Sequence, residues 1–358
     1  MQSNMFSHSV DTMSQTVRIP HIDSLRGTAV LLMVMVHAAA TWNPFSQVQT
    51  SPLAYVISGL GGLAAPLFVT LFGWGVVRTH TSLSSRVVQC LFFFVAQIAV
   101  NLTSPHLFHT FTPGILSLMG VLTLLVPATY SALEKHDIRV FSFFFAFTIV
   151  IQLLFSDIQG TGVWEDRTAD NTLGIIISNL LFTGTYPVFP WFVFAFFGAM
   201  ISRQKTASGR SLNLNTSTGM WIVFGLTYCT LTLVYSQMNQ TLWAHPTEDA
   251  LLTFFPANPS FLVAGITGVM LLWIAVQRFK FSFLASTGKI SLTIYLLHFM
   301  PLTLMRDYEV THQWGLQISS VAVLLYTVIW VPVASLWLYR WPKANVESLL
   351  RMIRKSLF

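Results

Sequence analysis

Apolar stretches of roughly membrane-crossing length recur along the whole chain and are separated by short polar segments. A helix needs about 20 mostly apolar residues to cross the hydrocarbon core of a bilayer. Ten stretches approach or reach this length: 25–43, 53–77, 87–104, 113–133, 140–157, 174–202, 219–238, 259–277, 282–304 and 315–339. The pattern predicts an all-α fold, a polytopic membrane helix bundle with about ten transmembrane helices.

Proline interrupts the sixth stretch, where Pro187 and Pro190 separate two apolar halves. Interrupted helices are tolerated at membrane depth where they line protein or a water-filled cavity rather than lipid. We therefore expect a short half-helix over 174–184, followed by a second helix over 188–202. The other nine stretches are interpreted as continuous helices.

Composition supports a membrane protein. Of the 358 residues, 54% are hydrophobic and only 9% are charged, whereas about a quarter of the residues of a soluble domain are charged. The net charge of +6 therefore reflects where basic residues lie relative to the membrane, and it is no evidence for a nucleic-acid partner. Cys90 and Cys229 both lie in apolar stretches, where a cysteine behaves as a small buried hydrophobe.

The distribution of basic residues predicts the orientation of the chain. If the N-terminus is cytoplasmic, 17 of the 19 Lys and Arg residues fall in inner segments, and only Arg167 and Arg306 lie outside. Such an excess marks the cytoplasmic side, so both termini are expected there. Three parts follow: a polar tail over 1–17 without the features of a cleaved signal, a transmembrane domain over 18–341, and a basic amphipathic tail over 342–358 lying on the inner leaflet.

The first predicted helix carries a polar stripe in "HIDSLRGTAVLLMVMVH". At about 100° and 1.5 Å per residue, Asp23, Arg26 and His37 point in similar directions, with His37 roughly 16 Å deeper than Arg26. Ionisable groups at such depth usually face a bundle interior or a cavity. His37 is either a structural histidine bonded to a neighbouring helix or a general base. We favour the base, because the stripe leads from an inner cation to a buried imidazole.

A second polar stripe lies in the ninth stretch, within "GKISLTIYLLHFMP". Ser291, Tyr295 and His298 are spaced by four and three residues and share one helix face. Lys289 is near the inner end, with His298 about 13 Å above it. Tyr295 could instead form an ordinary interhelical hydrogen bond, and His298 could be an interface anchor. From its depth, we expect His298 to pair with His37.

Two further histidines, His106 and His109, lie in the short outer segment "SPHLFHTFTPG". Their spacing of three residues would suit a metal, but no Cys or carboxylate accompanies them, and we predict no metal site. Loop histidines at the membrane interface are the simpler interpretation. They remain candidates for contact with a substrate on the outer side.

Several apolar motifs follow the first helix in a fixed order: "AAPLFVTLFGWGVVRTH", "FTPGILSLMGVLTLL", "YPVFPWFVFAFFGAMIS", "FFPANPSFLVAGITGVMLL" and "GKISLTIYLLHFMP". Together with "RIPHIDSLRGTAVLLMVMVH", they resemble the transmembrane acyltransferase superfamily over roughly Arg18 to Pro301. The nearest resemblance is to the heparan-α-glucosaminide N-acetyltransferase-like branch, which is related to the integral-membrane O-acyltransferases. This implies a bundle of ten or eleven helices. The bundle would transfer an acyl group, usually acetyl, from cytosolic acetyl-CoA or another acyl-CoA to a glycan amine or hydroxyl across the membrane.

The expected activity and the position of each polar group together suggest a role for each candidate residue. The donor would be bound by the basic groups at the inner helix ends, because guanidinium and ammonium groups pair with phosphates; these are Arg26, Arg78, Arg86 and Lys289. Catalysis would fall to His37, Asp23 and His298. The acceptor would contact Ser291, Tyr295, His106 and His109.

The motif departs from one branch of the superfamily at His37. Heparan-type enzymes of human carry Asn at this position and their proposed catalytic His in the following loop, whereas "WNPFSQVQTSP" contains no His. The O-acyltransferase branch has its His where His37 stands. The resemblance therefore supports the acyl-CoA donor more strongly than it supports a particular acceptor.

Two other classes compete with an acyl-CoA-dependent enzyme. A transporter or flippase of a glycan or lipid would show paired broken helices, and the sequence shows only one. A non-catalytic membrane subunit would have lost the inner cations or the buried histidine, and this chain keeps both. The expected partners are acyl-CoA, a glycan or small amine or hydroxyl acceptor, and lipids, with room for a homodimer. The protein is expected in the cell membrane or an internal membrane.

Overall fold

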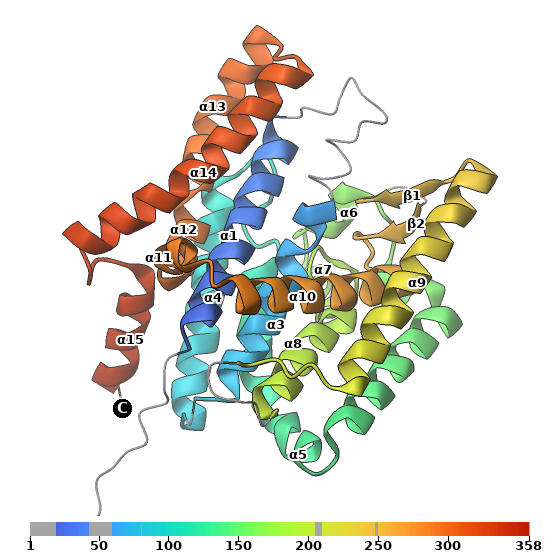
Figure 1. The fold of residues 1–358 in the computed structure, drawn as a ribbon. Coiled ribbons are helices and arrows are strands. Elements are labelled where there is room, and N and C mark those ends of the chain that lie inside the picture. Colours follow the sequence, from blue (N-terminus) through green and yellow to red (C-terminus); the bar gives the residue numbers. More distant parts are fainter. Residues whose placement is uncertain (1–18, 43–58, 80, 205–209, 248–249, 358) are drawn as a thin grey trace, which may run out of the picture.

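The computed structural model describes residues 19–42, 59–79, 81–204, 210–247 and 250–357, and the backbone alone over 130–139. These parts are almost wholly helical (Figure 1), which confirms the all-α class. Two short strands, β1 (Leu242–His245) and β2 (Ala250–Thr253), pair in parallel.

The helices match the apolar stretches of the sequence. The longer ones are α1 (Pro20–Thr41), α3 (Ala64–Val76), α4 (Leu83–Thr103), α5 (Ile115–Leu154), α8 (Val188–Arg203), α9 (Thr216–Asn239), α10 (Pro259–Phe279), α13 (Phe299–His312), α14 (Leu316–Arg340) and α15 (Val346–Leu357). The shorter ones are α6 (Trp164–Thr168), α7 (Leu173–Ser178), α11 (Ala285–Lys289) and α12 (Ser291–Leu297), with single turns η1 (Ser156–Gln159), η2 (Asn179–Thr183) and η3 (Ser282–Leu284).

Over the residues with assigned structure, six helices are long and apolar enough to cross a membrane, or up to eight if each of two bent pairs is one span. Two parts of α5, Ile115–Thr129 and Val140–Leu154, are shorter apolar helices. Each predicted stretch thus contains apolar helix. The count of ten spans and the cytoplasmic position of both termini stay predictions.

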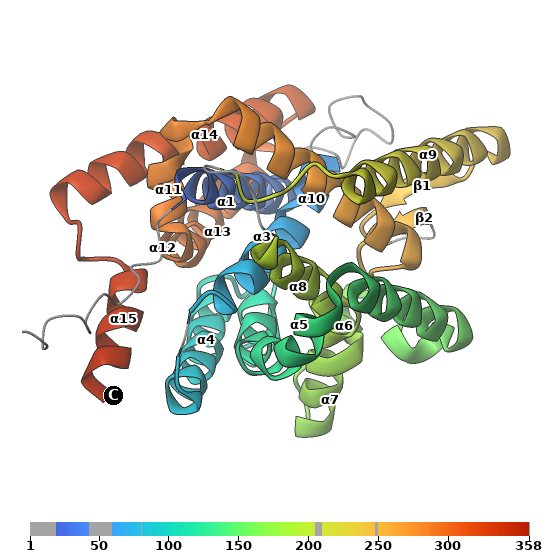
Figure 2. The same cartoon turned by 60° about the horizontal axis from the view of Figure 1, so that its bottom comes forward.

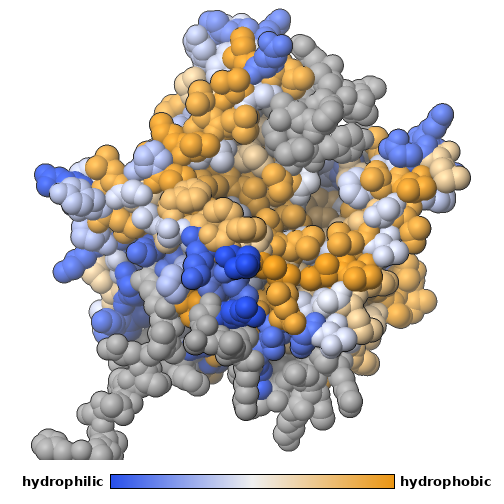
Figure 3. Space-filling view, in the orientation of Figure 1, coloured by the Kyte–Doolittle hydropathy of each residue, from blue (hydrophilic) through white to orange (hydrophobic). Residues whose placement is uncertain are grey.

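Close helix contacts hold the centre of the bundle together, where α1, α3 and α8 lie side by side (Figure 2). A Cβ atom at Gly73 would overlap the carbonyl of Ala195, and one at Gly198 would overlap the carbonyl of Thr70. Small residues of this kind let helices approach closely inside membranes, where packing replaces the hydrophobic effect. By contrast, α9 and α14 are mostly exposed and contribute to the apolar surface in Figure 3.

The sixth span is broken as predicted. The segment Leu173–Thr183, formed by α7 and η2, meets α8 at an angle of 46°. Arg167 of α6 stabilises the break, because its guanidinium donates hydrogen bonds to the carbonyls of Thr183, Gly184 and Gln159. The Arg167 side chain is almost fully buried, and burial lowers its pKa to about 10.

The ninth span is also broken, which corrects the prediction of a continuous helix over 282–304. Ser282–Lys289 and Ser291–His312 meet at 64°, and the backbone leaves the helical region at Ile290 (φ −121°, ψ 32°). Gly288 lies so close to α1 that a Cβ there would overlap the carbonyl of Asp23. The described residues therefore contain two broken spans, and the shortage of such breaks no longer counts against a transporter.

Candidate active site

A pair of histidines joins the first helix to the junction of α12 and α13. His37 Nδ1 lies 2.8 Å from His298 Nε2, although the two residues are 261 positions apart in the chain. The two rings are nearly coplanar and meet edge to edge, with centroids 5.1 Å apart and an interplanar angle of 12°. His298 is fully buried and His37 is half-buried. The pairing expected from the depth of the two residues is therefore present.

The hydrogen bonds around the pair select one tautomer of each neutral ring. His298 Nδ1 lies 2.8 Å from the carbonyl oxygen of Tyr295 and 3.1 Å from that of Ile294. A carbonyl only accepts, so His298 Nδ1 carries the proton and its Nε2 accepts a hydrogen bond. His37 must then donate from Nδ1, which leaves the lone pair on its Nε2. That atom is the one suited to accept a proton from a substrate.

Aromatic side chains enclose the two imidazoles. The Phe299 ring lies 4.8 Å from that of His37 and 4.0 Å from that of His298, measured between centroids. Tyr295 lies 6.5 Å from His37 and 5.8 Å from His298 by the same measure. The hydroxyl of Tyr326 donates a 2.6 Å hydrogen bond to the backbone carbonyl of His298. These contacts fix the position of the junction between α12 and α13.

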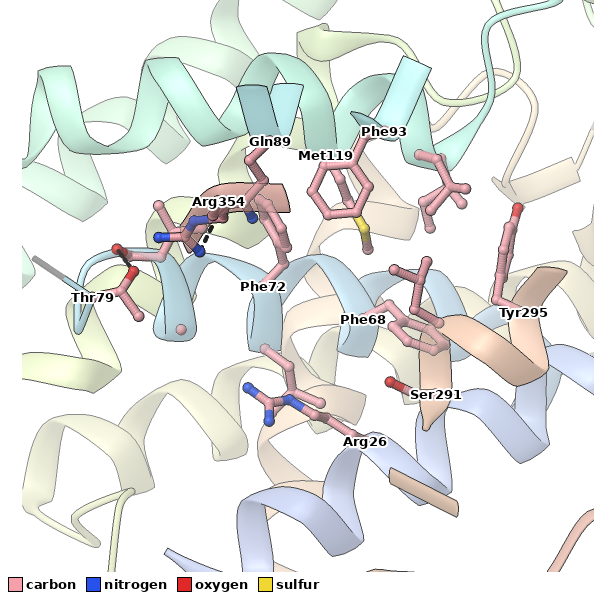
Figure 4. A pocket seen from close by; sticks show the side chains of 16 residues that line it. Arg26, Phe68, Phe72, Thr79, Gln89, Phe93, Met119, Ser291, Tyr295 and Arg354 are labelled. Atoms are coloured by element: carbon pink, nitrogen blue, oxygen red, sulfur yellow. Dashed lines mark hydrogen bonds between the residues drawn. The ribbon is translucent and has the colours of Figure 1, made fainter. Parts of the chain in front are cut away.

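A cavity of about 260 Å³ leads from Tyr295 toward basic residues. In Figure 4, Tyr295 lies on one side and Arg354 on the opposite side, with Phe93 and Met119 between them. Arg26 and Ser291 also line it. The cavity is thus basic at one end and apolar along its middle, and it ends beside the ring of a tyrosine that contacts the histidine pair.

The basic end is formed by helices from opposite ends of the chain. Arg26 comes from α1, and its Nη1 lies 3.5 Å from the Asp23 carboxylate. Arg354 comes from α15 and donates from Nε to Ser85 Oγ at 2.8 Å and from Nη1 to Gln89 Oε1 at 3.5 Å. Among the described residues that line this cavity none is acidic, and the Asp23 carboxylate that pairs with Arg26 lies outside the lining. The end is therefore suited to an anionic group.

The predicted donor-binding residues fall into two groups. Arg26 lines the cavity, and Arg78, Arg86 and Lys289 do not. The Arg78 guanidinium lies over the Trp74 ring at 4.6 Å. Arg86 bonds from Nε to Thr81 Oγ1 at 3.3 Å, and Lys289 is exposed at the end of α11, before the break.

The remaining predicted residues are also divided. Ser291 and Tyr295 line the cavity. Asp23 is fourteen positions before His37 on α1, a rise of about 21 Å, so its carboxylate belongs with Arg26 and cannot contact His37.

His106 and His109, between α4 and α5, are not among the lining residues either. Both ring nitrogens of His106 are buried without a hydrogen-bond partner. Burial and the nearby Arg306 lower the pKa of His106. His109 is exposed, and its backbone N–H donates to Thr112 Oγ1. Over the described ranges, no group of three or more His, Cys, Asp or Glu residues is placed to hold a metal ion.

Sequence reasoning missed Arg354 and Gln89 as cavity residues. The basic face of the tail was visible in the sequence and was interpreted as contact with lipid. The structure adds protein contacts, because α15 packs against α4 and α12.

A helical membrane bundle with paired histidines inside it and a basic, mostly apolar cavity nearby defines a class of multi-pass membrane proteins with a polar interior site. Comparison with protein families makes this specific: the chain belongs to the family described as "Acyltransferase domain", whose model matches residues 19–339. A search of curated proteins found no match. Membership supports an acyltransferase-type function in a multi-pass membrane protein, and it does not distinguish the heparan-type branch from the others.

Proposed function

We propose that the protein transfers an acyl group, first of all acetyl, from acyl-CoA to an amine or hydroxyl of a glycan or related acceptor. The observation that carries the proposal is a cavity that runs from Arg26 to Tyr295. His37 and His298 are not among its lining residues, and they lie behind the Tyr295 ring, at centroid distances of 6.5 Å and 5.8 Å. Family membership supports the acyltransferase class, and the donor and acceptor are inferred from the chemistry of the cavity.

The cavity suits the two halves of an acyl-CoA. The nucleotide half is a polyanion, and guanidinium groups bind phosphates through charge-assisted, often bidentate hydrogen bonds. The thioester arm is narrow and largely neutral, which matches a path lined by Phe68, Phe93 and Met119. Arg26 and His37 are separated by about 16 Å along α1, so phosphates bound at Arg26 would leave the arm pointing toward the histidines.

The chemistry follows from the tautomers. His37 Nε2 takes the proton of the acceptor hydroxyl or amine as the acceptor attacks the thioester carbonyl. The new C–O or C–N bond forms, the C–S bond breaks, and the proton passes to the departing CoA thiolate. His298 keeps His37 in the required tautomer and stabilises the imidazolium that forms transiently, and general-base catalysis of this kind contributes about 10²–10⁴-fold in rate.

A transporter or flippase is the second candidate, and the break at Ile290 favours it. Paired discontinuous helices often form the substrate site of transporters, and two bent spans occur in the part of the bundle that the structure describes. Histidines inside a bundle also relay protons in transporters, so the pair fits both candidates, and the match to the acyltransferase family favours the enzyme.

The test uses purified protein and labelled acetyl-CoA. CoA or acetyl-CoA should raise the unfolding temperature, and Arg26→Ala should abolish the rise, whereas Arg78→Ala, which removes a cation outside the cavity, should not. His37→Ala should keep the rise and lose acetyl transfer to a panel of amine and hydroxyl sugars. No stabilisation at millimolar CoA would contradict the enzyme, and transfer by His37→Ala would contradict its base.

A further inference from the structure

The C-terminal helix α15 lies beyond the segment that the family model matches, which ends at residue 339. It nevertheless contributes a side chain to the cavity, since Arg354 is one of the lining residues. It also contacts α12, the helix that carries Tyr295. A segment outside the family domain therefore lines the cavity through Arg354 and contacts the start of the helix that carries Tyr295.

The contact with α12 is made by the carboxylate of Glu347 in α15, which lies against the first turn of α12. Glu347 Oε1 accepts hydrogen bonds from the backbone N–H of Leu292 at 2.7 Å and of Thr293 at 3.3 Å. Its Oε2 accepts from Thr293 Oγ1 at 2.6 Å. These N–H groups lack intrahelical partners because the chain breaks at Ile290, and a carboxylate there also meets the positive end of the helix dipole. Glu347 thereby anchors α15 to α12.

At the other end, Arg354 is oriented by α4. Its bonds to Ser85 and Gln89, one helical turn apart, use Nε and Nη1, and a guanidinium has five N–H donors in total. The neighbouring basic residues of the tail, Arg351 and Lys355, are exposed. Arg354 is half-buried at the cavity, so it differs from them in what it can bind.

We infer that α15 completes the donor site: Arg354 binds a phosphate of the donor together with Arg26, and Glu347 is a positioning residue that keeps α15 and α12 in place. This inference rests on the proposed function. The shared ligand chemistry is a phosphate or diphosphate, which either a nucleotide or an anionic lipid headgroup could supply. Arg354 faces the same cavity as Tyr295, which favours the nucleotide.

The binding experiment compares Arg354→Gln with Arg351→Gln, both in the full chain. Arg351→Gln is the matched control, because Arg351 is exposed. Titration uses CoA and, separately, pantetheine, which has the thiol arm without the nucleotide. Arg354→Gln should weaken CoA binding about tenfold and leave pantetheine binding unchanged, whereas Arg351→Gln should change neither. Arg354→Lys, which keeps the charge, should recover part of the affinity.

The kinetic experiment addresses Glu347. Glu347→Gln keeps the shape of the side chain but replaces the carboxylate by an uncharged amide, which weakens the contact with α12. The kcat for acetyl transfer should therefore fall about tenfold, with a smaller change in the KM of acetyl-CoA. Glu347→Asp should restore part of kcat. A fall in kcat with an unchanged unfolding temperature separates positioning from general loss of structure.

Three results would overturn the inference. If Arg354→Gln binds CoA like the wild type while Arg26→Ala does not, α15 is no part of the donor site and the proposed function stands. If Arg354→Gln binds CoA like the wild type but binds vesicles of phosphatidylglycerol more weakly, Arg354 binds the phosphate of a lipid headgroup. If the wild type does not bind CoA at all, the proposed function fails with it.

Discussion

Replacing His298 by Phe tests the tautomer argument directly. Phe fills the buried site with a ring of similar width and removes Nε2, the acceptor for His37 Nδ1. The His37 ring then has no partner that prefers one tautomer, and its Nδ1–H loses a hydrogen bond in an aromatic surrounding. An unsatisfied polar group of this kind costs about 1–3 kcal/mol. If that cost falls on the transition state, kcat drops about 5- to 150-fold.

The measurement is kcat and KM for acetyl transfer with the variant in lipid nanodiscs. The KM of acetyl-CoA should stay close to that of the wild type, because His298 is not among the residues that line the cavity. His312→Phe is the matched control, since His312 is exposed at the end of α13. A His298→Phe enzyme with wild-type kcat would refute the reasoning, as would a loss fully explained by a lower unfolding temperature.

Three further predictions concern the scaffold and the basic end. Arg167→Met removes the donor of three carbonyls, those of the buried Gln159 and Gly184 and of the half-buried Thr183. It should destabilise the protein by about 2–4 kcal/mol, measured by reaction of Cys90 and Cys229 with a thiol probe on heating; an unchanged midpoint would contradict this. Gly198→Val should prevent stable assembly, because its Cβ would overlap the Thr70 carbonyl, whereas Gly219→Val, with open space around it, should not, as size-exclusion profiles would show. Asp23→Asn should weaken CoA binding more than it lowers kcat, since Asp23 pairs with Arg26; the reverse split would assign Asp23 to the chemistry.

The helices and the histidine pair were predictable because they depend on local properties. Apolar length marks each span, and the rise per residue places His37 and His298 at depth. Pro187 and Pro190 predict the break in the sixth span. The break at Ile290 carries no such signal, because it depends on the close approach of Gly288 to α1 and on Glu347 in the tail.

The direction of basic side chains was less predictable. Positive residues gather at inner helix ends for reasons of topology, and the rotation of each helix about its axis then decides which of them reach a cavity. Arg26 reaches it, and Arg78 instead covers Trp74. An amphipathic tail looks the same whether it rests on lipid or on α4, so Arg354 could not be distinguished from Arg351 by pattern.

The joining of the first and last helices around one cavity has a consequence for biosynthesis. During synthesis, α1 enters the membrane long before α12 and α15 have been made. Until then His37 lacks its hydrogen-bond partner His298, and Arg26 lacks Arg354 at the basic end of the cavity. On the proposed function, a chain that stops before α12 would therefore lack both the histidine pair and the complete donor site. Acyl transfer, on the same proposal, would begin only after α15 has been made and has packed against α4 and α12.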